Sequence, residues 1–254
     1  MNIKELINKI LFYVSVPKCV CCKERLDYGA RGLCNKCAAI YEAHKQRNCP
    51  RCAKILSRCF CSYEHLEAHG IKHLIKLFRY SKAEQSMPSN YLIYSLKQDN
   101  RDDVLSFLAE ELSEAMKASM DLSDTSKYVI SNVPRRKKAI VNFGYDHAKA
   151  LAVEVSKRLS VEYVELLKSK SKKSQKSVYG HERMENARFD YKCHSELSLK
   201  WKTLILIDDI VTTGASMSNC ATLIKALKPK GIVGACLGTA YKEKYIEFER
   251  SAFK

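Results

Sequence analysis

Residues 203–216, with the sequence TLILIDDIVTTGAS, decide how this chain is expected to fold. The segment opens with alternating Leu and Ile, and a short apolar run rich in β-branched residues is typical of a buried strand. Two carboxylates, Asp208 and Asp209, follow this run. Small and hydroxyl residues then lead into a helical pattern that ends at Leu227. Strand, acidic pair, loop and helix in this order predict an α/β fold with its ligand at the carboxyl ends of the strands.

The same order of residues indicates what the ligand is. Free N–H groups at a helix start attract phosphate, whereas two carboxylates beside a phosphate would repel it unless they bind something else. They suit sugar hydroxyls, or Mg²⁺ held through water. We therefore expect a sugar phosphate, with its ribose hydroxyls on Asp208 and Asp209. Its 5′-phosphate is expected on the loop formed by Val211, Thr212, Thr213, Gly214, Ala215 and Ser216. The alternative is a turn in which the aspartates only cap the helix.

Residues 203–216 resemble the phosphoribosyl pyrophosphate (PRPP) signature of type I phosphoribosyltransferases. In that signature an apolar strand, two acidic residues, two apolar residues and TTG come in this order. The resemblance implies a parallel-sheet type I phosphoribosyltransferase fold and PRPP, with Mg²⁺, as the ligand.

Length, net charge and cysteine content indicate the size, the class of partner and the location that we expect for this chain. Its 254 residues suffice for one large or two unequal domains. The net charge of +16 indicates an anionic partner, for which nucleic acid, a pyrophosphate substrate and a membrane surface all qualify. Residues 3–14 are expected to form a short amphipathic helix, and no apolar run approaches the roughly 18 residues of a membrane span. An intracellular location is expected, where clustered cysteines bind metal more often than they form disulfides.

Nine of the twelve cysteines fall between Cys19 and Cys61. A CxxC turn places two thiolates on one side of a metal ion, and two such turns complete a tetrahedral zinc site. One structural zinc site is expected from Cys19, Cys22, Cys34 and Cys37. A second is expected from Cys49, Cys52, Cys59 and Cys61, although the two sets can also pair in an interleaved order. We interpret His65, His69 and His73 as surface residues on one helix face.

The rest of the chain alternates helices and strands. Arg135 and Arg136 follow a strand that should end at the same sheet edge as Asp208, where cations suit a pyrophosphate. Helices are expected over 71–80, 103–120, 147–159 and 216–227, strands over 128–133, 161–167 and 232–239, a loop or short irregular helix over 81–101, and a mobile basic loop over 168–188.

The order of these features resembles the ComF family of competence-related proteins over nearly the whole chain. Four stretches carry the resemblance. They are the CxxC series, Val133-Pro134-Arg135-Arg136, Gln175 with Glu182-Arg183-x-x-Asn186, and residues 203–216. The family's RGFNQ segment is replaced here by residues 143–147, FGYDH, so that His147 stands in place of the amide.

This resemblance implies two parts and a role. Residues 1–66 would form an N-terminal helix and a zinc-binding cysteine module, and residues 67–254 a phosphoribosyltransferase-like domain. The implied role is in natural transformation, and the implied partners are single-stranded DNA and the DNA-uptake machinery at the inner membrane. The resemblance also implies a cytoplasmic protein without a membrane span, which can be peripheral to the inner membrane. An active phosphoribosyltransferase with an unidentified acceptor is the alternative.

Overall fold

The computed structural model describes residues 16–81, 84, 86–137, 140–141, 144–170, 189–192 and 199–240. The helix expected over residues 3–14 lies outside these ranges. So do most of the basic loop expected over 168–188 and, within it, Gln175, Glu182, Arg183 and Asn186.

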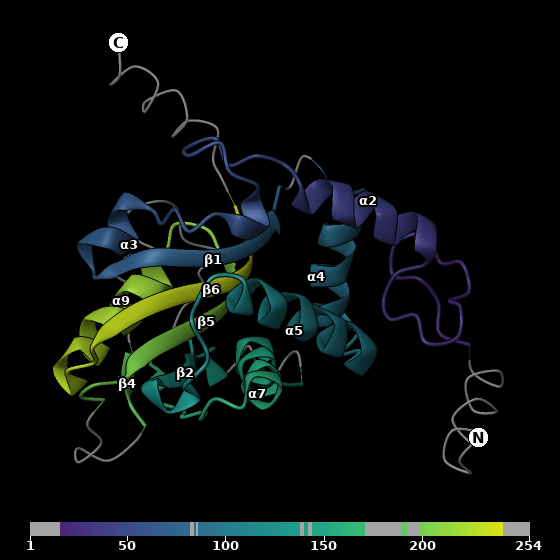
Figure 1. Cartoon of the computed structure of the whole chain (residues 1–254). Helices are drawn as coiled ribbons and strands as arrows, with labels where there is room; N and C mark the ends of the chain where they lie inside the picture. Colours follow the sequence, from purple (N-terminus) through teal and green to yellow (C-terminus); the bar gives the residue numbers. More distant parts are fainter. Residues whose placement is uncertain are drawn as a thin grey trace.

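A four-stranded parallel sheet organises the chain, with its strands in the order β1-β6-β5-β2. Strand β5 (Thr203–Val211) lies in the interior, between β2 (Tyr128–Asn132) and β6 (Gly231–Thr239), and β1 (Ile71–Arg79) forms the far edge. Helices cover both faces (Figure 1). Because both faces are covered, the strands read as nearly continuous apolar runs.

The two faces of β5 belong to two hydrophobic clusters. Ile205 and Ile207 pack in the cluster that contains α4 (Pro88–Gln98), α5 (Asp102–Lys117) and α7 (His147–Leu159). Leu204 and Leu206 pack in the other, with α3 (Glu64–Ala68) and α9 (Ala215–Ile224). A short 3-10 helix, η5 (Lys225–Leu227), extends α9, and another, η3 (Thr125–Lys127), precedes β2.

Most of the predicted elements are confirmed, namely the helices over 103–120, 147–159 and 216–227 and the strands over 128–133, 203–211 and 232–239. The start of α7 shows why the local sequence suffices. Asp146 is its N-cap, and its Oδ1 accepts a hydrogen bond from the backbone N–H of Lys149 at 3.2 Å.

The helix predicted over residues 71–80 is wrong, because this segment is strand β1. It pairs in parallel with β6, from Ile71 with Ile232 to Arg79 with Thr239. Residues 74–78 are all buried, so both faces of the strand are covered and no alternation of polar and apolar residues remains. A short apolar run of this kind does not distinguish a strand from a buried helix.

Two further predictions need correction. Residues 88–98 form a regular helix, α4, which begins at Pro88, where a proline is well tolerated because the first turn needs no N–H donor there. The strand predicted over 161–167 is reduced to one bridge, between Tyr163 and Ile130. The chain then forms β3 (Leu167–Ser169), which pairs antiparallel with β4 (Phe189–Tyr191) in a separate two-stranded sheet.

The cysteine-rich part packs directly on this α/β body. It contains α2 (Asn35–Lys45), the 3-10 helix η1 (Leu56–Arg58) and α3. Cys19, Leu33 and Tyr41 share a hydrophobic cluster with Phe78 of β1 and Leu108 of α5. A continuous core therefore runs through this contact, and the boundary expected between residues 66 and 67 stays a prediction.

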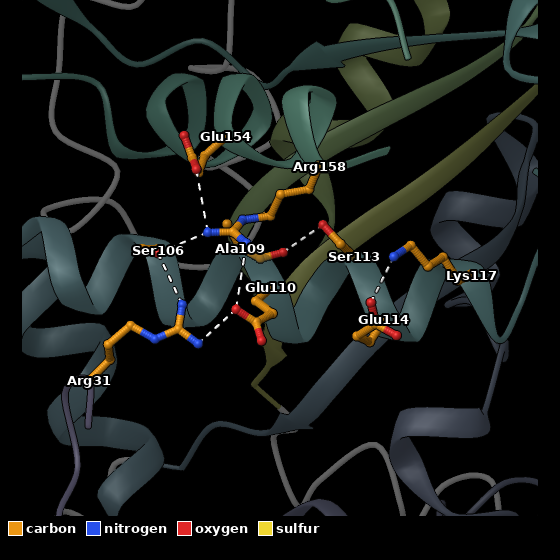
Figure 2. Close-up of polar contacts among 9 residues, drawn as sticks. All are labelled: Arg31, Ser106, Ala109, Glu110, Ser113, Glu114, Lys117, Glu154 and Arg158. Carbon is orange, nitrogen blue, oxygen red and sulfur yellow. Dashed lines mark hydrogen bonds and ion pairs between the residues drawn. The ribbon is translucent and has the colours of Figure 1, made fainter. Parts of the chain in front are cut away.

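Polar contacts reinforce this packing along one side of α5 (Figure 2). The guanidinium of Arg31, from the cysteine-rich part, lies 2.7 Å from the Glu110 carboxylate and 3.2 Å from Ser106 Oγ. Arg158 of α7 reaches the same two residues at 3.5 and 2.8 Å. Ser106 and Glu110 of α5 thus connect Arg31, in the loop between the first two CxxC turns, to α7. None of the helices in the described part of the chain is long and apolar enough to span a bilayer.

Candidate functional site

The predicted acidic pair lies near the carboxyl end of β5. Asp209 is 6% exposed and Asp208 is half-buried. Each carboxylate accepts a hydrogen bond from the next backbone N–H, Asp208 from Asp209 at 2.8 Å and Asp209 from Ile210 at 2.6 Å. These bonds hold both side chains at the edge of the sheet where ligands of α/β proteins bind.

Two cations meet at the Asp209 carboxylate. Its Oδ2 lies 2.9 Å from Nζ of Lys97 and 3.2 Å from Nη2 of Arg135. The structure thus places Arg135 at the same edge as Asp208 and Asp209, as the sequence predicts. Arg136 is half-buried, and within the described part of the chain no contact between it and either aspartate is found.

Sequence analysis missed Lys97. It lies in the last turn of α4, in the stretch interpreted as a loop or short irregular helix. The signal available was the apolar spacing of Leu92, Ile93 and Leu96 after Pro88, which predicts a helix that buries one side. Even then, only the packing of α4 shows that Lys97 reaches Asp209.

The two aspartates titrate in opposite directions. Burial would raise the pKa of Asp209, but the charges of Lys97 and Arg135 outweigh burial and lower that pKa to about 2. Burial and the neighbouring Asp209 charge raise the pKa of Asp208 well above its usual value. Asp209 is therefore ionised at neutral pH and pairs with the two cations. The negative charge of Asp208 is unfavourable in its surroundings.

The small-residue loop turns tightly between β5 and α9. Gly214 caps α9 with a φ of 78°, in the left-handed region that favours glycine. A Cβ at this position would lie 2.9 Å from the side chain of Leu66 in α3. Thr212 is exposed, Thr213 and Ser216 are half-buried, and Thr213 Oγ1 accepts a weak bond from the Ala215 N–H at 3.4 Å. The loop thus joins the acidic pair to a helix N-terminus, as predicted, and α3 supports it from behind.

Asp146 and His147, from the segment that departs from the family pattern, lie close to Arg135. Asp146 Oδ2 accepts a hydrogen bond from the Arg135 backbone N–H at 3.0 Å, so the cap of α7 also positions the basic turn. His147 is fully buried, and burial followed by the Arg135 charge lowers its pKa to about 4. Its ring lies 4.5 Å from that of Tyr145. A neutral imidazole therefore packs beneath the cations of the site.

The predicted cysteine sets form two clusters. In each cluster the four Sγ atoms lie within 4.8 Å of one another. A tetrahedral zinc with bonds of about 2.3 Å separates its sulfur ligands by about 3.8 Å, so both clusters fit such an ion. The grouping follows chain order rather than the interleaved alternative. It comprises Cys19, Cys22, Cys34 and Cys37, then Cys49, Cys52, Cys59 and Cys61.

The first CxxC turn of each cluster has the same backbone geometry. The N–H of Lys23 bonds to the carbonyl of Cys19, and that of Ala53 to the carbonyl of Cys49. Lys23 and Ala53 both have positive φ, 66° and 56°. The two turns are therefore structural repeats, in which a left-handed residue directly follows the second cysteine.

A buried lysine lies beside the second cluster. Lys76 of β1 is 1% exposed, and its Nζ donates to the carbonyl oxygens of Cys61 at 2.8 Å and Cys59 at 3.3 Å. It also lies 3.4 Å from Cys59 Sγ. Four thiolates around a divalent ion carry a net charge of −2, so a buried ammonium offsets part of it. Lys76 thus joins this cluster to the sheet, together with the bridge between Cys61 and His73, and sequence analysis did not single it out.

The three histidines do not share one helix face. His65 and His69 lie in or beside α3 with ring centroids 4.6 Å apart, but His73 is exposed on β1. His65 is half-buried rather than on the surface, and its Nε2 lies 2.8 Å from Ser218 Oγ in α9. This contact and that of Leu66 fasten α3 to the start of α9.

Comparisons with known proteins agree with this geometry. Residues 147–251 match the model of the phosphoribosyl transferase domain. Over 207 residues the chain is 27% identical to competence protein ComFC of Streptococcus pneumoniae, a match that covers 79% of this chain and 84% of that protein. The chain is therefore similar to competence protein ComFC. It combines the cysteine clusters with a phosphoribosyl transferase domain of the parallel-sheet type I fold.

Solved structures similar to this chain include two phosphoribosyltransferases. A purine phosphoribosyltransferase of Pyrococcus horikoshii is 19% identical, with a TM-score of 0.31, over 54% of this chain and 71% of that one. A hypoxanthine phosphoribosyltransferase of Staphylococcus aureus is 11% identical, with a TM-score of 0.35, over 55% of this chain and 73% of that one.

The contacts of Lys76 predict a role in metal retention by the second cysteine cluster. The unchanged protein should hold two zinc ions per chain. Lys76→Met should weaken the second site by about 10- to 100-fold, as changes around metal ligands usually do, and leave the first unchanged. Zinc content after dialysis against a graded series of chelator concentrations measures this. Lys72→Met, at an exposed lysine near the start of the same strand, is the control, and equal zinc retention by both variants would contradict the role.

The opposite pKa shifts of the aspartates predict opposite effects on stability. Because folding raises the pKa of Asp208, its charge destabilises the folded state once the pH exceeds the unfolded value of about 3.9. Asp208→Asn should therefore raise Tm at pH 7, by about 2–4 °C for each kcal/mol, and the gain should disappear below about pH 4. Asp209→Asn should lower Tm at pH 7, since stability from a depressed pKa is present above about pH 4 and is lost towards pH 2. Thermal unfolding across this pH range measures both, and shifts of equal sign would contradict the assignment.

Proposed function

We propose that this protein binds PRPP with Mg²⁺ at the carboxyl end of β5. The observation that carries the proposal is the contact of Asp209 with both Lys97 and Arg135, at 2.9 and 3.2 Å, directly before a loop that starts a helix. Cations for a pyrophosphate, carboxylates for a ribose and a helix N-terminus for a phosphate thus lie at one sheet edge. PRPP carries all three of the groups that these would bind.

The residues of the site have separate tasks in this proposal. Asp208 and Asp209 accept hydrogen bonds from the ribose hydroxyls, and Mg²⁺ would lie beside them and the pyrophosphate. Lys97 and Arg135 exchange their contact with Asp209 for the pyrophosphate oxygens, because charge-assisted bonds to phosphate suit both side chains. The 5′-phosphate binds to the N–H and hydroxyl groups of the loop that consists of Thr212, Thr213, Gly214, Ala215 and Ser216. The pKa of Asp208 falls as the cation binds, which offsets its unfavourable charge.

The biological role proposed is in DNA uptake during natural transformation. The protein would handle incoming single-stranded DNA on the cytoplasmic side of the inner membrane, in contact with the uptake machinery or peripheral to that membrane. The similarity to a competence protein supports this role. The net charge of +16 supports it as well, because phosphate backbones bind basic surfaces in a salt-dependent manner.

A second candidate function is phosphoribosyl transfer from PRPP to a base or another acceptor. The intact acidic pair and loop favour it, because both are complete in this chain. Catalysis would consist mainly of positioning and of charge stabilisation as pyrophosphate leaves. Binding of PRPP is common to both candidates, and only turnover separates them.

The ligand assignment predicts a loss of binding when the carboxylates are removed. The double variant Asp208→Ala with Asp209→Ala should not bind PRPP in the presence of Mg²⁺. Asp209→Asn and Lys97→Met should each bind about 10- to 100-fold more weakly, since a bond to a charged group contributes about 1.5–3 kcal/mol. Isothermal titration calorimetry measures these affinities.

Glu110→Gln serves as the matched control for this titration. Glu110 also contacts two cationic side chains, Arg31 and Arg158, but lies on α5 away from the acidic pair. It should bind PRPP as the unchanged protein does. Equal affinities for the double variant and the control would remove the site assignment.

Pyrophosphate release distinguishes the two candidate functions. With PRPP, Mg²⁺ and a panel of purine and pyrimidine bases, the DNA-uptake proposal predicts a rate that no base increases. Phosphoribosyl transfer instead predicts an increase with at least one acceptor, abolished in the double variant. A coupled assay for free pyrophosphate measures the rate.

A further inference from the structure

The amino ends of the strands carry a row of lysines, at the opposite end of the sheet from the acidic pair. Strands β2, β5 and β6 begin directly after Lys127, Lys202 and Lys230. Their first residues are in register, Tyr128 beside Thr203 and Thr203 beside Gly231. Adjacent strands lie about 4.8 Å apart, so the three lysines start neighbouring strands at one edge. This edge lies at the left of Figure 1, next to the end of α9.

The only tryptophan of the chain stands on this edge. Trp201 is 75% exposed and lies between Lys200 and Lys202. Its φ of 74° places a bulky residue in the left-handed region, where glycine or asparagine is the usual choice. Such backbone strain is unfavourable and is concentrated at functional positions. The turn therefore presents a large indole to solvent at an energetic cost.

Lysines precede and follow this indole in the chain. Lys200 Nζ lies 5.3 Å from the centre of the Trp201 ring, and the backbone N–H of Lys230 bonds to the carbonyl of Lys202 at 2.9 Å. Lys202 and Lys127 have acidic partners, Glu162 at 2.7 Å and Asp124 at 3.2 Å. For Lys228 and Lys230, both exposed, no ion pair is found among the residues that the structure describes. We call Trp201 with Lys200, Lys202, Lys228 and Lys230 the amino-edge surface.

We propose that the amino-edge surface binds single-stranded nucleic acid, with a base stacked on Trp201 and the backbone phosphates on the lysines. Aromatic platforms within a basic groove bind single strands without sequence preference, because every base has a π-face. A paired base inside a duplex cannot stack on an exposed side chain. The amino-edge surface would be the place where the single-stranded DNA of the proposed function binds. The proposal rests on the proposed function only in naming DNA as the nucleic acid.

An anionic membrane surface is the other partner that basic and aromatic residues can recognise. Interfacial binding needs a contiguous apolar face that enters the lipid. Within the described residues, the exposed large hydrophobic side chains are Tyr28, Ile40, Tyr94, Val141 and Trp201. Only Trp201 among them belongs to the amino edge. A single indole among lysines fits a stacked base better than a lipid surface.

The amino-edge surface and the PRPP site are far enough apart to act independently. Strand β5 runs between them, from Thr203 to Val211, and a strand of nine residues spans about 26 Å at about 3.3 Å per step. A change at Trp201 should leave PRPP binding unchanged. A change at Asp209 should leave DNA binding unchanged.

The fluorescence of Trp201 tests the proposal directly, because it is the only tryptophan. In this protein an oligo(dT) of 20 nucleotides should quench the fluorescence, and a duplex of the same length should quench it much less.

Trp201→Ala should weaken binding of a labelled oligo(dT) about tenfold in an anisotropy assay, since stacking contributes about 1–3 kcal/mol per base. Trp201→Phe should recover most of that loss. Lys228→Gln with Lys230→Gln should reduce the dependence of affinity on salt.

Tyr94→Ala is the matched control, because Tyr94 is also exposed (62%) but lies on α4, which contacts the opposite edge of the sheet through Lys97. The absence of quenching, or equal DNA affinities for Trp201→Ala and Tyr94→Ala, would overturn the proposal. A blue shift with anionic vesicles but no response to oligo(dT) would overturn it in favour of a membrane. Calorimetry with PRPP is carried out on the Trp201→Ala protein in parallel. Unchanged PRPP binding shows that this variant is folded, and it separates a failure of the DNA-binding proposal from a failure of the PRPP assignment.

Discussion

The parallel pairing of β5 with β2 on one side and β6 on the other is the constraint on which the rest of this protein depends. It brings the ends of three strands into register. At their carboxyl ends, Arg135 after β2 meets Asp209 of β5, and α4 adds Lys97 from above the sheet. At their amino ends, the same register aligns the lysines around Trp201. The same backbone hydrogen bonds therefore position the aspartates and their two cations at the carboxyl edge of the sheet and the lysines at its amino edge.

The cysteine clusters are part of this arrangement rather than an appendage to it. Tyr41 of α2 shares a core with Phe78 of β1, and Arg31 joins the polar contacts of α5. The second cluster has the closest link to the site. Lys76 donates to its cysteine carbonyls from within the sheet, and Leu66 of α3 packs where a Cβ on Gly214 would otherwise lie. Folding of the cysteine turns and positioning of the loop before α9 are thus connected through short, buried contacts.

The elements that sequence analysis predicted correctly are those with strong local signals. The α7 helix has an aspartate cap and a regular apolar spacing, and α5 has a long amphipathic pattern. The errors fall where burial on all sides removes the pattern. Strand β1 is covered on both faces, so its apolar run resembles a helix as much as a strand. The prediction of a loop or short irregular helix over 81–101 fails for another reason, because a proline such as Pro88 can start a helix at its first turn.

The sequence by itself determined the chemistry of this protein, namely the acidic pair, the small-residue loop, the basic turn and two sets of four cysteines. Each of these is a short segment whose residue types and spacing are already visible in the sequence. Only the tertiary structure decided which distant groups meet them. Lys97 at Asp209, Lys76 at the second cysteine cluster and Leu66 behind Gly214 are contacts between residues far apart in the chain. They follow from how helices and strands pack, and spacing along one chain carries no information about that.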